Sequence, residues 1–174
     1  MEDESSCMIP VPGKKALDVN SIDLLENEGC LHGINAFSVR FHDALKKGKH
    51  LDYILGNKKN PVCVDFIIPG KIVDDDPRKE PPYFPGTKKM LLVFQSIHPI
   101  EFLTAEMGEK HVIPSGEYGA GTWTTIVNGN ASIVKDKSGY TLKLEGKQFK
   151  TRTYKIVHYS GKDKKNYLIW KMET

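Results

Sequence analysis

A lysine-rich segment of this chain carries two histidines and an aspartate at spacings that suit metal binding. If Gly48 and the lysines beside it form a tight hairpin loop, His42 ends one strand, and His50 and Asp52 begin the next. Side chains alternate between the two faces of a strand, so His50 and Asp52 point the same way and His42 faces them across the hairpin. Two imidazoles and a carboxylate on one face are ligands for a divalent transition metal, with positions left open for water or substrate. The spacing alone also fits a surface hairpin whose polar side chains face solvent.

The elements that must position these ligands follow from the pattern of apolar residues and turns. Alternation predicts a strand at 36–42, its partner at 50–55 and a central strand at 62–68. Further strands are expected at 90–95, 123–127, 131–134, 140–145, 152–159 and 167–172, with turns between them that include one at 128–130. Many short strands joined by polar glycine turns predict a mostly β fold, a compact closed or nearly closed antiparallel β-barrel with one or two short helices.

Length and composition favour one barrel domain with an N-terminal extension. Residues 1–35 are expected to form a tail and a short helix beginning at Ser21 that packs on the domain of residues 36–174. The segment 73–86 holds three adjacent aspartates and four prolines, which predicts an exposed loop. The three cysteines have no C-x-x-C spacing, which argues against a disulfide framework and a zinc knuckle. No apolar run is long enough to cross a bilayer and the N-terminus is acidic, so we expect an intracellular protein, cytoplasmic or nuclear, without a membrane partner.

Positive charge gathers beside the candidate ligands although the formal net charge is only +3. The cations near the histidines are Lys46, Lys47, Lys49, Lys58 and Lys59, and more lysines crowd the C-terminal third. Clustered cations beside a metal site indicate a polyanionic substrate such as nucleic acid. Solvated strand and loop ends are the alternative explanation for these lysines.

A glycine-rich run is the most distinctive motif of the chain. Residues 113–121 read I-P-S-G-E-Y-G-A-G, and three glycines within six residues let the backbone turn sharply and pass close to another strand or a ligand. Together with F-H-D-A at 41–44, H-L-D at 50–52, H-P-I-E-F at 98–102 and the terminal Y-L-I-W-K at 167–171, this run resembles the 3'-phosphoesterase domain of DNA ligase D. The order and approximate spacing of these motifs agree with that family from about residue 36 to the C-terminus.

The resemblance implies a manganese-dependent enzyme that trims DNA 3' ends in repair, removing a terminal 3'-phosphate or a 3'-terminal ribonucleotide. By position, His42, His50 and Asp52 are implied as ligands for Mn²⁺, and other divalent transition metals also suit them. His98 is similar to the family histidine that contacts the phosphate, and if protonated it would stabilise the transition state or protonate the leaving oxygen. Asp43 matches a family aspartate and is expected to hold His42 in the required tautomer.

The chain departs from the family at several phosphate-binding positions. The family arginine two residues after the metal-binding aspartate is Ile54 here, and the family tyrosine after the H-P pair is Phe102. A family lysine is displaced to Lys71, which with Arg40 is a candidate to replace the lost charge. The side chains expected to contact the DNA backbone without reading bases are Lys47, Lys49 and Arg152.

Two other classes of function remain open beside the phosphoesterase. One is a catalytically silent nucleic-acid-binding module on the same barrel, which would bind DNA ends but release no phosphate. The other is an unrelated small β-barrel that binds a protein partner. The ligands retained in family order favour the enzyme. Its expected partners are DNA or DNA/RNA 3' ends and a separately encoded ligase or polymerase.

Overall fold

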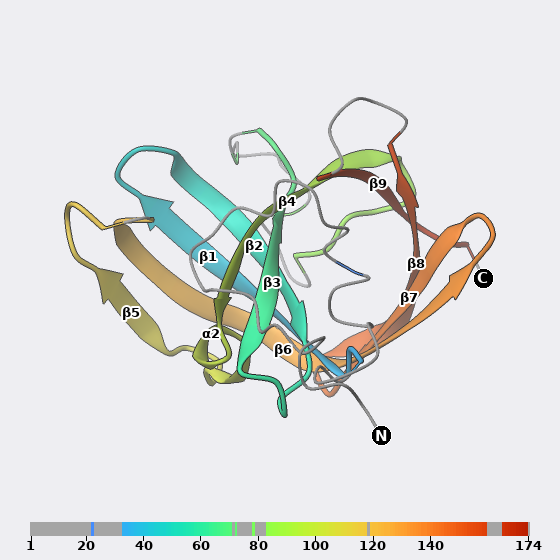
Figure 1. The fold of residues 1–174 in the computed structure, drawn as a ribbon, viewed down its shortest axis with the longest axis horizontal. Coiled ribbons are helices and arrows are strands. Elements are labelled where there is room, and N and C mark those ends of the chain that lie inside the picture. The colour runs from blue at the N-terminus through green and yellow to red at the C-terminus, as the bar shows by residue number, and fades with distance from the viewer. Residues whose placement is uncertain are drawn as a thin grey trace, which may run out of the picture.

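The computed structural model describes Ile22, residues 33–70, Ile72, Arg78, and residues 83–117, 119–159 and 165–173. Its strands are β1 (Ala36–Ala44), β2 (Gly48–Gly56), β3 (Val62–Ile67), β4 (Met90–Pro99), β5 (Lys110–Ile113), β6 (Gly121–Asp136), β7 (Gly139–Gly146), β8 (Phe149–His158) and β9 (Asn166–Lys171) (Figure 1). A short helix, α2 (Glu101–Thr104), follows β4. The predicted mostly β class is therefore confirmed. Lys71 and the expected helix at Ser21 lie outside the described residues, except for Ile22, which is helical and fully buried.

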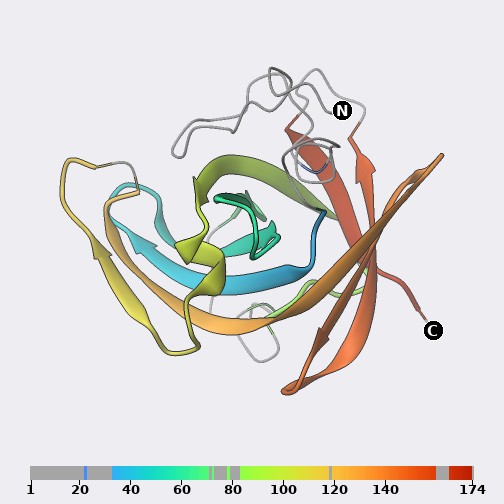
Figure 2. The ribbon, with the colours of Figure 1, turned by 60° about the horizontal axis from the view of Figure 1, so that its bottom comes forward.

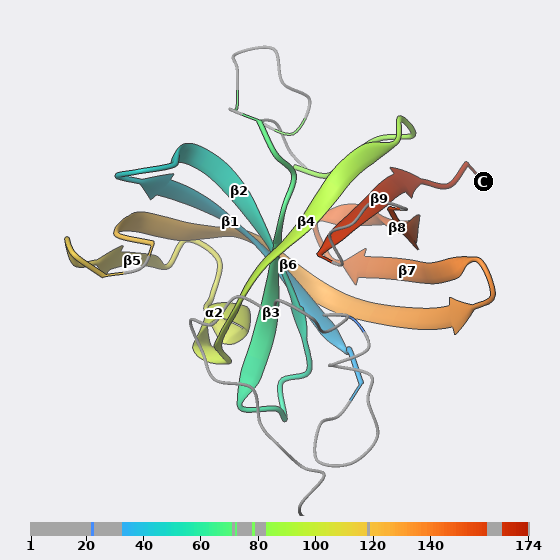
Figure 3. The same cartoon turned by 45° about the horizontal axis from the view of Figure 1, so that its top comes forward.

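The described strands form one antiparallel sheet that closes on itself. Its order is β1-β2-β3-β4-β9-β8-β7-β6-β5, and β1 also pairs with β6, so eight strands complete a ring while β5 extends it beside β6. The hairpin of β1 and β2 lies with β5 on one side of Figure 3, and β7, β8 and β9 lie on the other. Because β1 pairs with β6, the sheet has the nearly closed barrel form that the turn spacing predicted.

The long strand β6 joins the two sides of the ring, and it corrects the prediction of a turn at 128–130. Its first half pairs with β5 and β1, and its second half pairs with β7 (Figure 2). Gly129 lies inside this strand, where a Cβ atom would meet the Glu145 carbonyl oxygen and lie 2.9 Å from the Phe37 ring. The glycine is required for close packing rather than for a turn.

Alternation along β1 to β4 sends apolar and polar side chains to opposite faces. Phe37 and Val39 join the main core cluster together with Val64 and Phe66 of β3 and aromatic residues of β8 and β9. Ser38, Arg40 and His42 alternate with these apolar residues along β1 and point to the opposite face, yet they too are buried. Both faces of this hairpin are therefore covered, and the polar side chains on the second face need partners from within the protein.

A small apolar cluster closes one end of the polar face. It consists of Ala36, Ile54, Cys63 and Leu103 of α2, with Phe102 packed against it.

The described part of the segment 73–86 is not the exposed loop that was predicted. Arg78 and Phe84 are each 6 % exposed. Phe84 packs with Phe37 in the main core, and Arg78 donates to the carbonyl oxygen of Ile68 at 3.1 Å. Within the described residues, no helix has the length and apolar character needed to cross a membrane.

Candidate metal centre

The β1–β2 hairpin brings together the two histidines and the aspartate as the sequence predicted. His42 lies directly opposite His50 in the antiparallel register, and Asp52 lies opposite Arg40. A ligand atom from each of His42, His50 and Asp52 falls within 4.8 Å of the other two. The three side chains are largely buried, at 7 %, 13 % and 2 % exposure for His42, His50 and Asp52.

The two histidine–aspartate separations match those around a divalent transition metal. Nδ1 of His42 lies 3.3 Å from one oxygen of Asp52, and Nε2 of His50 lies 3.3 Å from the other. Metal–ligand bonds of about 2.0–2.2 Å separate neighbouring ligand atoms by roughly 3.0–3.5 Å in tetrahedral or octahedral sites. Nitrogen and carboxylate oxygen donors are suited to manganese, iron or zinc. These three residues can therefore hold one ion with coordination positions to spare.

The electrostatics of the hairpin also favour a bound cation. Burial alone would raise the pKa of Asp52, but the adjacent Arg40 charge and hydrogen bonds from His42 and His50 hold it well below its usual value. For His50, burial tends to lower the pKa, yet the hydrogen bond and charge of Asp52 outweigh it and raise the pKa above the usual histidine value. The ionised carboxylate thus attracts positive charge to His50, as a proton or as a metal ion.

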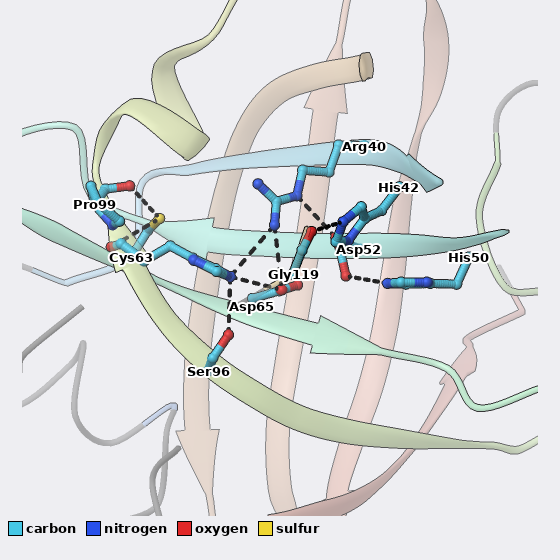
Figure 4. Close-up of polar contacts among 10 residues, drawn as sticks. Arg40, His42, His50, Asp52, Cys63, Asp65, Ser96, Pro99 and Gly119 are labelled. Carbon is cyan, nitrogen blue, oxygen red and sulfur yellow. Dashed lines mark hydrogen bonds and ion pairs between the residues drawn. The ribbon is translucent and has the colours of Figure 1, made fainter. Parts of the chain in front are cut away.

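Arg40 lies at the centre of the buried polar network (Figure 4). Its side chain is 1 % exposed, and its Nε donates to Asp52 Oδ2 at 3.0 Å while Nη2 lies 3.6 Å from Asp65 Oδ2. The guanidinium also lies over the rings of Phe102, at 4.3 Å, and Trp123, at 4.9 Å. An arginine so enclosed stabilises the two buried carboxylates. Its burial does not support the expectation that it contacts a substrate phosphate.

Sequence reasoning missed two polar partners of His98. Nε2 of His98 lies 3.0 Å from the Ser96 hydroxyl and 3.1 Å from Asp65 Oδ2. Both contacts involve the same ring nitrogen, so the three residues do not form a proton-relay triad, which uses both nitrogens. Asp65 had a sequence signal, since it is the one charged residue in the apolar run 62–68. Burial and the Asp52 charge raise the pKa of Asp65 well above its usual value.

His98 is a neutral imidazole in this environment. Burial and the nearby Arg40 charge lower its pKa to about 3. The ring packs against Phe102, with 4.4 Å between ring centroids, in the position where the resembled family has a tyrosine. A neutral His98 does not act as the proton donor that the sequence hypothesis required.

A pocket of about 210 Å³ opens beside the ligands. Its wall includes Arg40, all three candidate ligands, Asp65 and His98. Its mouth is formed by the hairpin tip, with Lys46 and Lys47, and by the glycine loop, with Ser115, Gly116 and Glu117. Both lysines are exposed, so positive charge lies on the hairpin side of the opening, and the exposed Glu117 adds a negative charge on the loop side.

Three other predicted residues do not take part in this site. Asp43 is exposed, because neighbouring strand residues point to opposite faces, and His42 is instead contacted by Asp52 and by the Gly119 carbonyl. Lys49 lines a separate groove on the other face of the hairpin. Arg152 lies on β8 with its guanidinium over the Phe84 ring, far from the histidine pocket in the topology of the ring.

Ile54 occupies the position at which the resembled family has an arginine, and its surroundings are apolar. Ile54 is fully buried and packs with Cys63 and Leu103 in the small cluster beside the polar network. An arginine side chain at this place would be enclosed by apolar neighbours. A comparison of the chain with protein-family models and with curated proteins finds no match.

Proposed function

We propose that this chain is a divalent-metal-dependent phosphoesterase that acts on DNA 3' ends, with manganese as its ion. It would remove a terminal 3'-phosphate or a 3'-terminal ribonucleotide, in repair carried out with a separately encoded ligase or polymerase. The observation that carries the proposal is the convergence of His42, His50 and Asp52 on the wall of an open pocket. The resemblance of the motifs to the ligase D phosphoesterase domain supplies the reaction class.

The residues around the pocket suit a phosphate group at the end of a chain. A divalent ion on the three ligands supplies positive charge for a phosphate oxygen. Lys46 and Lys47 at the mouth attract a polyanion without selecting a base sequence. The volume of about 210 Å³ admits a terminal phosphate and its sugar but not a duplex. The substrate therefore enters by its end, with the rest of the nucleic acid outside the pocket.

A catalytically silent nucleic-acid-binding module is the second candidate, favoured by the burial of Arg40. The cation nearest the proposed metal is 1 % exposed and is paired with Asp52 and Asp65. A substrate phosphate in the pocket would thus meet an arginine whose charge is already shared by two carboxylates, which weakens a stabilisation of the transition state that contributes several kcal/mol in related sites. This candidate retains binding to metal and DNA and predicts no turnover.

The two candidates are separated by incubating the protein with a 3'-phosphate primer-template and Mn²⁺. The phosphoesterase releases phosphate and leaves a 3'-hydroxyl, which a polymerase then extends. His50→Ala and Asp52→Ala should each abolish the release, since they remove ligands. A parallel substrate with one 3'-terminal ribonucleotide tests the second activity.

His111→Ala is the matched control for the histidine variant. Its side chain is 43 % exposed, pairs with Glu109 and is not part of the pocket wall. It should retain full release of phosphate. Equal activity in the His50→Ala and wild-type proteins would rule out the proposed metal centre. Binding of Mn²⁺ and DNA without any phosphate release would instead identify the silent module.

A further inference from the structure

Each imidazole of the candidate metal centre contacts a backbone carbonyl on the side away from Asp52. Nε2 of His42 donates to the carbonyl oxygen of Gly119 at 2.7 Å (Figure 4). Nδ1 of His50 donates to the carbonyl oxygen of Gly48 at 3.1 Å. A carbonyl oxygen only accepts hydrogen bonds, so in each ring the nitrogen that faces the carbonyl carries the hydrogen.

These contacts leave one lone pair in each neutral ring, on the other nitrogen. In His42 that nitrogen is Nδ1, and in His50 it is Nε2. These are the atoms that lie 3.3 Å from the two oxygens of Asp52. With hydrogen on these atoms the rings donate to Asp52, and without it their lone pairs and the carboxylate can share one cation, which is the arrangement of a metal site whose histidines are oriented by outer partners.

We propose that His42 binds the metal through Nδ1 and His50 through Nε2, and that Gly119 and Gly48 are the positioning residues that impose this choice. The inference rests on the proposed metal centre and adds the identity of its ligand atoms. It also gives the glycine run of residues 113–121 a role at the site. The run supplies the carbonyl that fixes the tautomer of His42, which the sequence had assigned to Asp43.

Both carbonyls owe their direction to a backbone conformation that glycine adopts most readily. Gly119 has φ +79° and Gly48 has φ +75°, in the left-handed region. At Gly48 this conformation closes the three-residue hairpin loop that joins β1 to β2. A Cβ at Gly119 would lie 3.5 Å from Cε1 of His42, an ordinary contact, so a side chain there is resisted by the backbone angle and not by lack of space.

Gly119→Ala and Gly108→Ala form a matched pair that isolates the carbonyl. Gly108 has φ +83° with open space around its Cα and does not line the pocket, so alanine meets similar backbone resistance there away from the metal centre. Loss of an outer partner of a ligating histidine weakens metal affinity by about 10–100-fold. We expect that loss of Mn²⁺ affinity in Gly119→Ala, while Gly108→Ala keeps the wild-type value. Gly119→Asn should restore much of the affinity, because asparagine tolerates the left-handed region.

The tautomers give a readout that strain in the loop would not reproduce. Nitrogen-15 spectra of the protein loaded with diamagnetic Zn²⁺ should show hydrogen on Nε2 of His42 and on Nδ1 of His50, with the other nitrogen of each ring bound to the metal. Gly119→Ala should shift His42 toward a mixture of metal-bound forms, and Gly108→Ala should not. Hydrogen on Nδ1 of His42 in the zinc-loaded wild-type protein, or equal Mn²⁺ affinity in wild type and Gly119→Ala, would overturn the inference. A wild-type protein that binds no divalent metal would instead overturn the proposed function.

Discussion

Replacing Arg40 with methionine should destabilise the protein more than any other single loss of charge in the described chain. The substitution keeps an apolar stem but leaves Asp52 and Asp65 buried without their shared cation. A charged hydrogen bond contributes about 1.5–3 kcal/mol, and a desolvated cation–π contact about 2 kcal/mol. These terms overlap, so we take the cost of breaking a buried ion pair, about 3–5 kcal/mol, as the expected loss in the free energy of unfolding.

The destabilisation caused by Arg40→Met should be smaller at acidic pH than at neutral pH. The depressed pKa of Asp52 contributes stability above its unfolded value, and this contribution disappears as the pH falls through the folded value. In Arg40→Met the buried Asp52 protonates more readily, so the difference from wild type should shrink on acidification. Urea unfolding followed by circular dichroism at neutral and acidic pH measures both effects.

Arg152→Met is the control for removing a partly buried arginine. Its guanidinium lies 5.1 Å from the Phe84 ring and its side chain is only half-buried, so we expect a loss of about 1 kcal/mol. If Arg40→Met unfolds within about 1 kcal/mol of wild type at neutral pH, Arg40 does not hold the two carboxylates together and the account of the polar network is wrong.

Three further predictions follow from the same network and from the strand contacts. Burial and the Asp52 charge raise the pKa of Asp65, so wild-type stability should fall as the pH rises from about 4 toward that raised value, and unfolding of Asp65→Asn across the same pH series should lack this fall. The raised pKa of His50 makes protons compete with metal, so Mn²⁺ affinity measured by calorimetry should drop up to about tenfold per pH unit below that pKa and the drop should be absent at higher pH. Gly121→Ala places a Cβ against the β1 backbone and should lower the melting temperature strongly, whereas Gly86→Ala, with open space, should leave it nearly unchanged; similar melting temperatures for both would contradict the packing argument.

The parts of the site that lie close together in the sequence could be predicted from it. The register of a hairpin is set by its own loop, so the position of His42 opposite His50 followed from Gly48 and from alternation. The prediction for Asp43 failed for the same physical reason, since the residue after His42 must point to the other face. The alternation of side chains along the strand therefore excludes Asp43 as a partner of His42.

Partners from distant strands could not be placed from one sequence. Asp65 and Ser96 reach the site through the pairing of β3 with β4, and Arg40 meets Trp123 through the pairing of β1 with β6. Nothing local specifies these pairings, which depend on how the whole ring closes. Lys47, Lys49 and Arg152 were grouped by their charge alone, although the ring sends β8 to the side opposite the hairpin (Figure 3).

The path of ring closure has a consequence for how the protein acquires its ion. The ligands belong to one hairpin, whereas the closure joins Ala44 to Gly121 across most of the domain. Local hairpins form in microseconds, while contacts between distant residues form later and more slowly. We therefore expect the ligands to meet before the strands that bury them are in place. An ion captured by the nascent hairpin would be enclosed as folding finishes, so metal exchange in the mature protein should be slower than metal uptake during refolding.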